Sequence, residues 1–117
     1  MLQALFGNPN IERVLWYIDF FEQGYATAIA KTYGVPLNPI LNALDRLEKG
    51  SILDSFLVGK TRVYRFNPRW VFLKELHPLL EKSRNALPQD EYDRYFKVRR
   101  RPRRKGKPLD FPGDIVN

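Results

Sequence analysis

Residues 28–48 read AIAKTYGVPLNPILNALDRLE, and the interruption in the middle of this stretch decides the predicted fold. Two short helical patterns meet there. The first ends at Gly34, which can adopt the left-handed conformation that closes a helix, and Pro36 cannot continue it. The second begins at Asn38, whose side-chain oxygen can cap a helix, with Pro39 in the first turn. The stretch therefore predicts two helices joined by a tight turn, which is either a helix-turn-helix unit or an ordinary helical hairpin.

The second helix, predicted over residues 38–49, has one apolar and one polar side. Ile40, Leu44 and Leu47 recur at helical spacing, so we expect them to face the core. The remaining positions form the outer side, which comprises Asn38, Pro39, Leu41, Asn42, Asp45 and Arg46. If duplex DNA lies against this side, the amides can make paired hydrogen bonds to the edge of adenine.

Two β-prone runs follow, residues 52–58 and 61–66, and they meet at Gly59-Lys60. A glycine between two such runs predicts a β-hairpin. Alternation along the second run separates its side chains onto two faces, with Arg62, Tyr64 and Phe66 on one and Thr61, Val63 and Arg65 on the other. The order helix, turn, helix, hairpin is that of a winged helix, so we predict an α+β, mainly helical fold with a two-stranded wing and an extra C-terminal helix.

Residues 28–68 resemble the winged helix-turn-helix of ArsR- and MarR-type bacterial and archaeal regulators. The matching positions are Ile29-Ala30, Gly34-Val35, the series Ile40, Leu44 and Leu47-Glu48, and the wing ending Gly59-Lys-Thr-Arg-Val-Tyr-Arg-Phe-Asn-Pro68. The last run is the most specific, because such proteins commonly end the wing with Tyr-Arg-Leu-Asn-Pro. Leu5-Phe6-Gly7 also resembles the winged-helix domain that precedes some nucleotidyltransferase domains. The resemblance covers about residues 5–82 and implies a DNA-binding transcriptional regulator, often a homodimer.

The resemblance and the groove geometry together assign the predicted DNA contacts. On the second helix, Asn38 and Asn42 would reach base edges beside Pro39, and Arg46 would reach phosphate or guanine. At the wing, the predicted contacts to the backbone or the minor groove are Lys60, Thr61, Arg62 and Arg65.

Some residues on these surfaces suit DNA poorly. Asp45 would meet phosphate repulsion, and the resembling regulators usually carry polar or basic residues where this chain has Leu41, Phe56 and Leu57. Winged helices also serve as protein-interaction modules. The alternative hypothesis is therefore a protein-binding adaptor that uses Leu41, Phe56 and Leu57 as an apolar patch.

Length and composition limit the other classes of protein. A chain of 117 residues with 16 aromatic residues predicts one domain with a real core, assigned to residues 1–85, and an extension over residues 86–117 with a short helix at 89–96. The absence of Cys excludes disulfides and thiolate metal sites, and His77 is the only histidine, so we predict no metal and no cofactor. No catalytic signature occurs at usable spacing, which argues against an enzyme. No apolar run is long enough to span a membrane, which suits a cytoplasmic protein.

The positive charge is concentrated in a tail over residues 97–108. Residues 1–96 carry 12 basic and 11 acidic side chains, whereas the tail carries eight basic and no acidic ones. Mutual repulsion and two prolines predict a tail that is flexible when unbound. Its predicted phosphate contacts are Lys97, Arg99, Arg100, Arg101, Arg103, Arg104, Lys105 and Lys107. Such a tail does not distinguish DNA from RNA or an acidic protein, so RNA binding through the tail is a further alternative.

The remaining helices raise two structural questions. The first helix, predicted from Asn8-Pro9 to about Gln23, has more apolar residues than one face can hold. We expect Trp16, Tyr17 and Phe20 to contact either a second copy in a homodimer or the C-terminal helix of the same chain. A further helix should begin at residues 68–70 and break or kink near His77, because Pro78 follows it.

Overall fold

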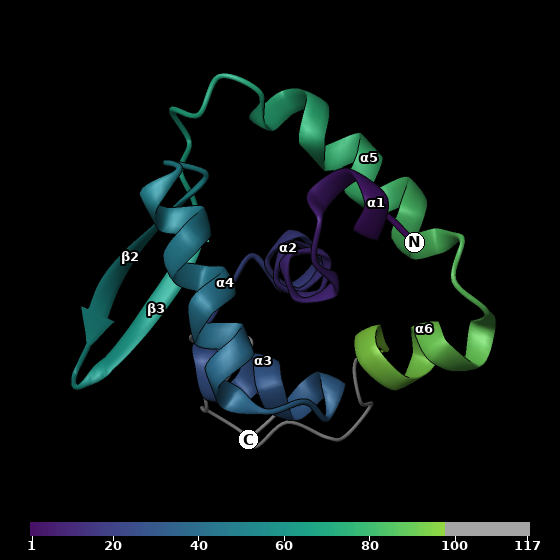
Figure 1. Ribbon diagram of the computed structural model, residues 1–117, viewed down its shortest axis with the longest axis horizontal. Helices are drawn as coiled ribbons and strands as arrows, with labels where there is room; N and C mark the ends of the chain where they lie inside the picture. Colours follow the sequence, from purple (N-terminus) through teal and green to yellow (C-terminus); the bar gives the residue numbers. More distant parts are fainter. Residues whose placement is uncertain (98–117) are drawn as a thin grey trace, which may run out of the picture.

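The computed structural model describes residues 1–97, and over these residues the chain is an α+β protein in which helices account for 61% of the residues. Figure 1 shows α2 near the centre of the view with the other elements around it. Within the described residues the helices are α1 (Gln3–Phe6), α2 (Pro9–Phe21), α3 (Ala26–Tyr33), α4 (Leu37–Lys49), α5 (Leu73–Asn85) and α6 (Gln89–Phe96). The strands are β1 (Gln23–Gly24), β2 (Leu53–Val58) and β3 (Thr61–Phe66), and they form one antiparallel sheet in the order β1-β3-β2.

The central helix α2 begins where the sequence predicts. The Asn8 side chain accepts a hydrogen bond from the backbone N–H of Asn10 at 2.7 Å, and Pro9 occupies the first turn. The helix ends at Phe21, earlier than predicted, because Glu22 takes a φ of 77° and the next two residues pair with β3 as β1. The sheet therefore has a third strand that the sequence does not predict.

The turn between α3 and α4 confirms the break predicted at Gly34. Gly34 has a φ of 65° and its N–H bonds to the carbonyl of Lys31 at 3.2 Å. The predicted cap is two residues late, because Pro36 and not Asn38 is the N-cap residue. Helix α4 begins at Leu37, one residue before the predicted range 38–49. Asn38 is therefore inside the first turn, and its side chain does not cap the helix.

The predicted hairpin is confirmed, with β2 and β3 paired from Leu53↔Phe66 to Val58↔Thr61. The two-residue connection is Gly59-Lys60, and Gly59 takes a φ of 64°, which a residue with a side chain rarely adopts. Figure 1 shows the hairpin projecting from the body of the molecule beside α4.

Of the break or kink predicted near His77, the break does not occur, because α5 runs without interruption from Leu73 to Asn85 through Pro78. Pro78 deprives only the carbonyl of Lys74 of its helical partner, and Lys74 is exposed to water. The helix also begins later than the predicted residues 68–70, and it buries Leu76 and Leu80.

Helix α6 closes the core over α2. Phe96 is 0% exposed, and its ring contacts Trp16 edge-on at 6.1 Å between centroids and Phe20 at 5.4 Å. The structure therefore corrects the prediction that Trp16 and Tyr17 contact a second copy, because these side chains are 5% and 0% exposed within one chain. Phe20 is half-buried against Tyr92 and Phe96. The alternative expectation, coverage by the C-terminal helix, holds for Trp16 and Phe20.

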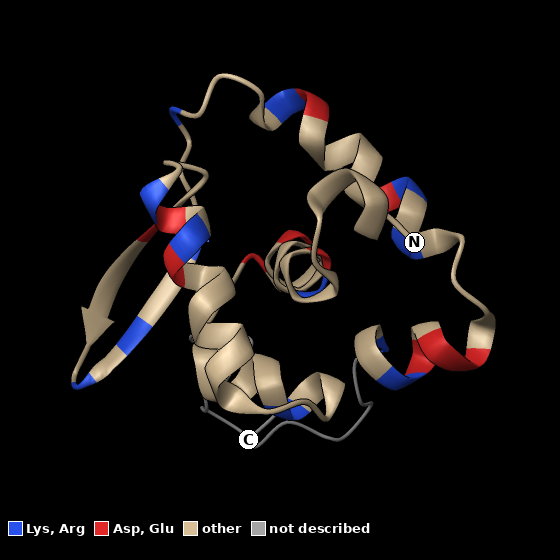
Figure 2. Cartoon of the chain, viewed as in Figure 1, with Lys and Arg blue, Asp and Glu red and all other residues tan. Residues whose placement is uncertain are grey.

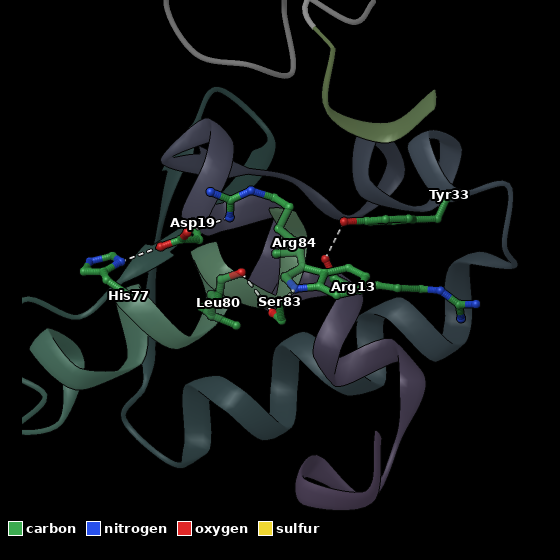
Figure 3. A network of polar contacts seen from close by, with 8 residues as sticks. Arg13, Asp19, Tyr33, His77, Leu80, Ser83 and Arg84 are labelled. Atoms are coloured by element: carbon green, nitrogen blue, oxygen red, sulfur yellow. Dashed lines mark hydrogen bonds and ion pairs between the residues drawn. The ribbon is translucent and has the colours of Figure 1, made fainter. Parts of the chain in front are cut away.

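A partly buried polar network fastens α2 to α5 (Figure 3). Asp19 accepts a hydrogen bond from Arg84 at 2.7 Å, with both side chains 7% exposed, and also contacts His77. The indole N–H of Trp16 donates to the hydroxyl of Ser83 at 2.9 Å. Each contact joins residues more than 50 positions apart in the sequence, so the network sets how the helices pack.

Candidate nucleic-acid interface

The outer face of α4 is exposed because four inward residues anchor the helix: Ile40, Ala43, Leu44 and Leu47 are buried. Asn38, Asn42 and Arg46 are exposed and occupy successive turns of this face, as the sequence predicts. Among the described residues, none of these three side chains has a hydrogen-bond or ion-pair partner. Their donors and acceptors are therefore available to a ligand, whereas Pro39 is half-buried.

Asp45 occupies the same face, one turn before Lys49. Its carboxylate lies 3.0 Å from the Lys49 ammonium, and both side chains are well exposed. Such a pair contributes little to stability. It does balance the acidic charge locally, which reduces the repulsion that Asp45 alone would exert on a polyanion.

The hairpin face that turns toward α4 carries a chain of hydrogen bonds. The Ser55 hydroxyl donates to the Glu48 carboxylate at 2.6 Å and accepts from Arg62 Nη1 at 3.0 Å. Burial, and then the nearby Glu48 carboxylate, raise the pKa of Tyr64, which pairs with Ser55 across the strands. Glu48 and Ser55 were not predicted as part of this surface, because Ser55 shares a face with Arg62 only through the strand register, in which Ser55 pairs with Tyr64.

The opposite hairpin face holds Arg65, which lies three positions from Arg62. Arg65 Nε lies 3.1 Å from the Asp54 carboxylate, and its guanidinium covers the Phe56 ring at 5.0 Å from the centroid. The four predicted wing contacts therefore lie in different positions on the hairpin. Arg62 lies beside α4, Lys60 is exposed at the tip, Thr61 is half-buried, and Arg65 faces away from α4 in an ion pair.

The predicted apolar patch of Leu41, Phe56 and Leu57 is not a single surface. Leu41 and Leu57 are 39% and 59% exposed. Phe56 and Leu57 point to opposite faces of β2, because they are neighbours in a strand, and Phe56 is half-buried under Arg65. The placement of Phe56 therefore corrects this prediction.

Charge is distributed unevenly between the two sides of the molecule (Figure 2). Lys60 and Arg62 lie on the wing, while Asp90, Glu91 and Asp93 lie on α6. Figure 2 shows the wing and α6 on opposite sides of α2. Of the eight tail cations, the described part includes Lys97, which is exposed; the predicted contacts from Arg99 to Lys107 lie outside the described residues.

Within residues 1–97, no group of three or more His, Cys, Asp or Glu side chains is placed to hold a metal ion. None of the described helices has the length and apolarity needed to cross a membrane. Comparison of the chain with protein-family models, with curated proteins and with solved structures finds no match.

Proposed function

We propose that this chain is a winged helix-turn-helix protein that binds duplex DNA and regulates transcription. In this proposal α3 and α4 form the helix-turn-helix, α4 enters the major groove, and the β2–β3 hairpin is the wing. The observation that carries the proposal is the outer face of α4, where Asn38, Asn42 and Arg46 are exposed and unpaired among the described residues. This face lies beside a hairpin that carries the exposed cations Lys60 and Arg62.

The spacing on α4 suits base recognition. Asn38, Asn42 and Arg46 are four residues apart, so successive side chains lie about 6 Å apart along the helix, at roughly 1.5 Å per residue. That spacing corresponds to about two base-pair steps of roughly 3.4 Å each. The amides would bind the N6 and N7 positions of adenine, and Arg46 would bind guanine or a phosphate.

The wing and the tail would supply the contacts that do not depend on sequence. Lys60 and Arg62 would hold the phosphate backbone or enter the minor groove. The eight tail cations would add attraction to any nucleic acid, with a log-log salt slope of up to about −7, at roughly 0.9 per phosphate contact. The acidic helix α6 lies away from the wing, so it would not oppose the approach of DNA (Figure 2).

A second candidate function is a protein-binding adaptor, which the exposure of Leu41 and Leu57 favours. An apolar side chain on the outer face of α4 can contact a thymine methyl group, but it can also anchor a protein partner. Leu41→Asp distinguishes the two functions. Loss of a co-purified protein with unchanged DNA binding supports the adaptor.

Selection of bound sequences from a random duplex pool tests the DNA-binding proposal. We expect the full chain to enrich a defined motif, and the spacing of any half-sites would report whether it binds as a homodimer. Asn42→Ala should lose preference at one or two positions of the motif. The matched control is Asn85→Ala, which removes an exposed amide from the end of α5. If the full chain enriches no sequence more strongly than a basic peptide with the tail sequence does, the proposal is refuted.

A further inference from the structure

The side chain of Ser55 joins α4 to both strands of the hairpin. Its hydroxyl gives its only hydrogen to Glu48 Oε2 at 2.6 Å, and its oxygen accepts from Arg62 Nη1 at 3.0 Å. Because a hydroxyl has one donor and two acceptor positions, the bond to Glu48 turns a lone pair of Ser55 toward Arg62. The three residues come from α4, β2 and β3, so this chain of bonds fixes the position of the Arg62 guanidinium relative to α4.

The two arginines of β3 are held in different ways. Arg65 faces an ionised carboxylate, Asp54, directly across the strand pair, and its charge is balanced there. Arg62 donates from Nη1 to a neutral hydroxyl, whereas Arg65 donates from Nε to a carboxylate. Each guanidinium keeps four of its five N–H donors, so the two arginines differ in the charge of the group they contact and not in the donors that remain. Arg62 is exposed and lies on the face that turns toward α4.

We infer that Ser55 is a positioning residue for DNA binding, and that Arg62 rather than Arg65 is the wing's phosphate contact. This inference rests on the proposed function. Arginine loses side-chain conformational entropy when it binds a phosphate. A guanidinium that is already held in place by a hydrogen bond loses less of this entropy on binding. The bond from Ser55 therefore strengthens binding through Arg62, and Glu48 keeps Ser55 in the required orientation. The bonds also link the base-reading helix and the wing contact into one unit, which sets the spacing between them on the duplex.

A double-mutant cycle in the full chain tests the inference, with the duplex enriched by the wild-type chain as probe and a scrambled duplex as reference. Arg62→Ala should weaken binding about tenfold, as expected for a charge-assisted hydrogen bond, and should reduce the salt slope by about 0.9. Ser55→Ala should weaken binding about threefold and leave the salt slope unchanged, because the charge remains. In the Arg62→Ala background, Ser55→Ala should have no further effect.

Three further variants separate this role from a structural one. Ser55→Thr retains the hydroxyl and should bind within about twofold of wild type. Arg62→Lys retains the charge but not the planar group, so it should weaken binding at an unchanged salt slope. The matched control is Arg65→Ala, on the same strand and the opposite face, which should bind within about twofold of wild type. Thermal unfolding of each variant verifies that it is folded.

Additive effects of Ser55→Ala and Arg62→Ala would overturn the inference while the proposed function stands. If Arg65→Ala lowers the affinity for the enriched duplex as much as Arg62→Ala does, the inference is also overturned while the proposed function stands. A wild-type chain that binds the enriched and scrambled duplexes equally well would refute sequence-specific recognition itself and, with it, this inference.

Discussion

Replacing Phe96 with alanine tests whether α6 belongs to the same core as α2. Phe96 is 0% exposed and contacts the rings of Trp16, Phe20 and Tyr33. The helix that carries it has eight residues, which is too short to persist in water without packing. Loss of the Phe96 ring should therefore weaken the attachment of α6, which would then depend on Tyr92 against Phe20 and Tyr95 against Tyr33.

The expected cost follows from this burial. Phe-to-Ala substitutions at fully buried positions lower the free energy of unfolding by about 3–5 kcal/mol. Arg84 also loses a ring 5.8 Å from its guanidinium, although it keeps Phe20 and Asp19. Domains of this size are stable by about 5–15 kcal/mol, so the variant should lose roughly a fifth or more of its stability. The melting temperature should fall by at least about 12 °C.

Urea unfolding followed by circular dichroism measures this loss. The matched control is Arg94→Ala, which alters an exposed residue of the same helix and should change the free energy of unfolding by less than about 0.5 kcal/mol. If Phe96→Ala unfolds within about 1 kcal/mol of wild type, α6 does not contribute to the core, and the packing argument is wrong.

Three other perturbations probe the centre of the molecule. Gly24→Ala would place a Cβ 2.4 Å from the buried ring of Tyr17, so urea unfolding should show a loss of about 1–3 kcal/mol. Asp19→Ala leaves the buried guanidinium of Arg84 without its carboxylate, and the same assay should show a loss of about 3–5 kcal/mol. Burial raises the pKa of Tyr17 and Tyr33 above the ordinary value of 10.0, so the folded chain holds protons that the unfolded chain releases above that pH. Denaturation midpoints at a series of pH values should therefore fall above pH 10.0, and fall less steeply in Tyr17→Phe.

Each of these has a result that would contradict it. Gly24→Ala at wild-type stability would mean that the Tyr17 ring can move aside. An Asp19→Ala variant as stable as wild type would mean that Arg84 reaches water. A Tyr17→Phe variant that loses stability as steeply as wild type in alkali would mean that other groups cause the loss.

Several features of the fold followed from local patterns in the sequence. Helical spacing separated the buried Ile40, Leu44 and Leu47 from the exposed Asn38 and Asn42. The left-handed position at Gly34 and the hairpin connection at Gly59 were also predictable, because glycine is the residue that adopts such backbone angles without steric cost. These features involve neighbours within a few residues, so the sequence contains all of the information that they require.

Other features depended on contacts between distant residues. Strand β1 has two residues and exists because β3 is available to pair with it, so no local signal marks it. Helix α5 continues through Pro78, since the carbonyl left without a partner belongs to the exposed Lys74. The candidate site shows the same limit. Alternation placed Arg62 and Arg65 on opposite faces, but the partners Ser55 and Asp54 emerged only from the strand register and the packing of α4.

The amphipathic periods and glycine positions were sufficient to specify the helices around residues 28–48 and the hairpin after them, because they act through short-range backbone geometry. The apolar surplus on α2 showed that Trp16 and Phe20 must be covered, but the sequence did not show which helix, of this chain or of a second copy, covers them. The covering helix α6 lies some 75 residues further along the chain, and it was identified by the burial of Phe96 against those rings. Long-range packing therefore decides which surface remains exposed to a ligand. Such packing cannot be predicted from the periodicity of one sequence.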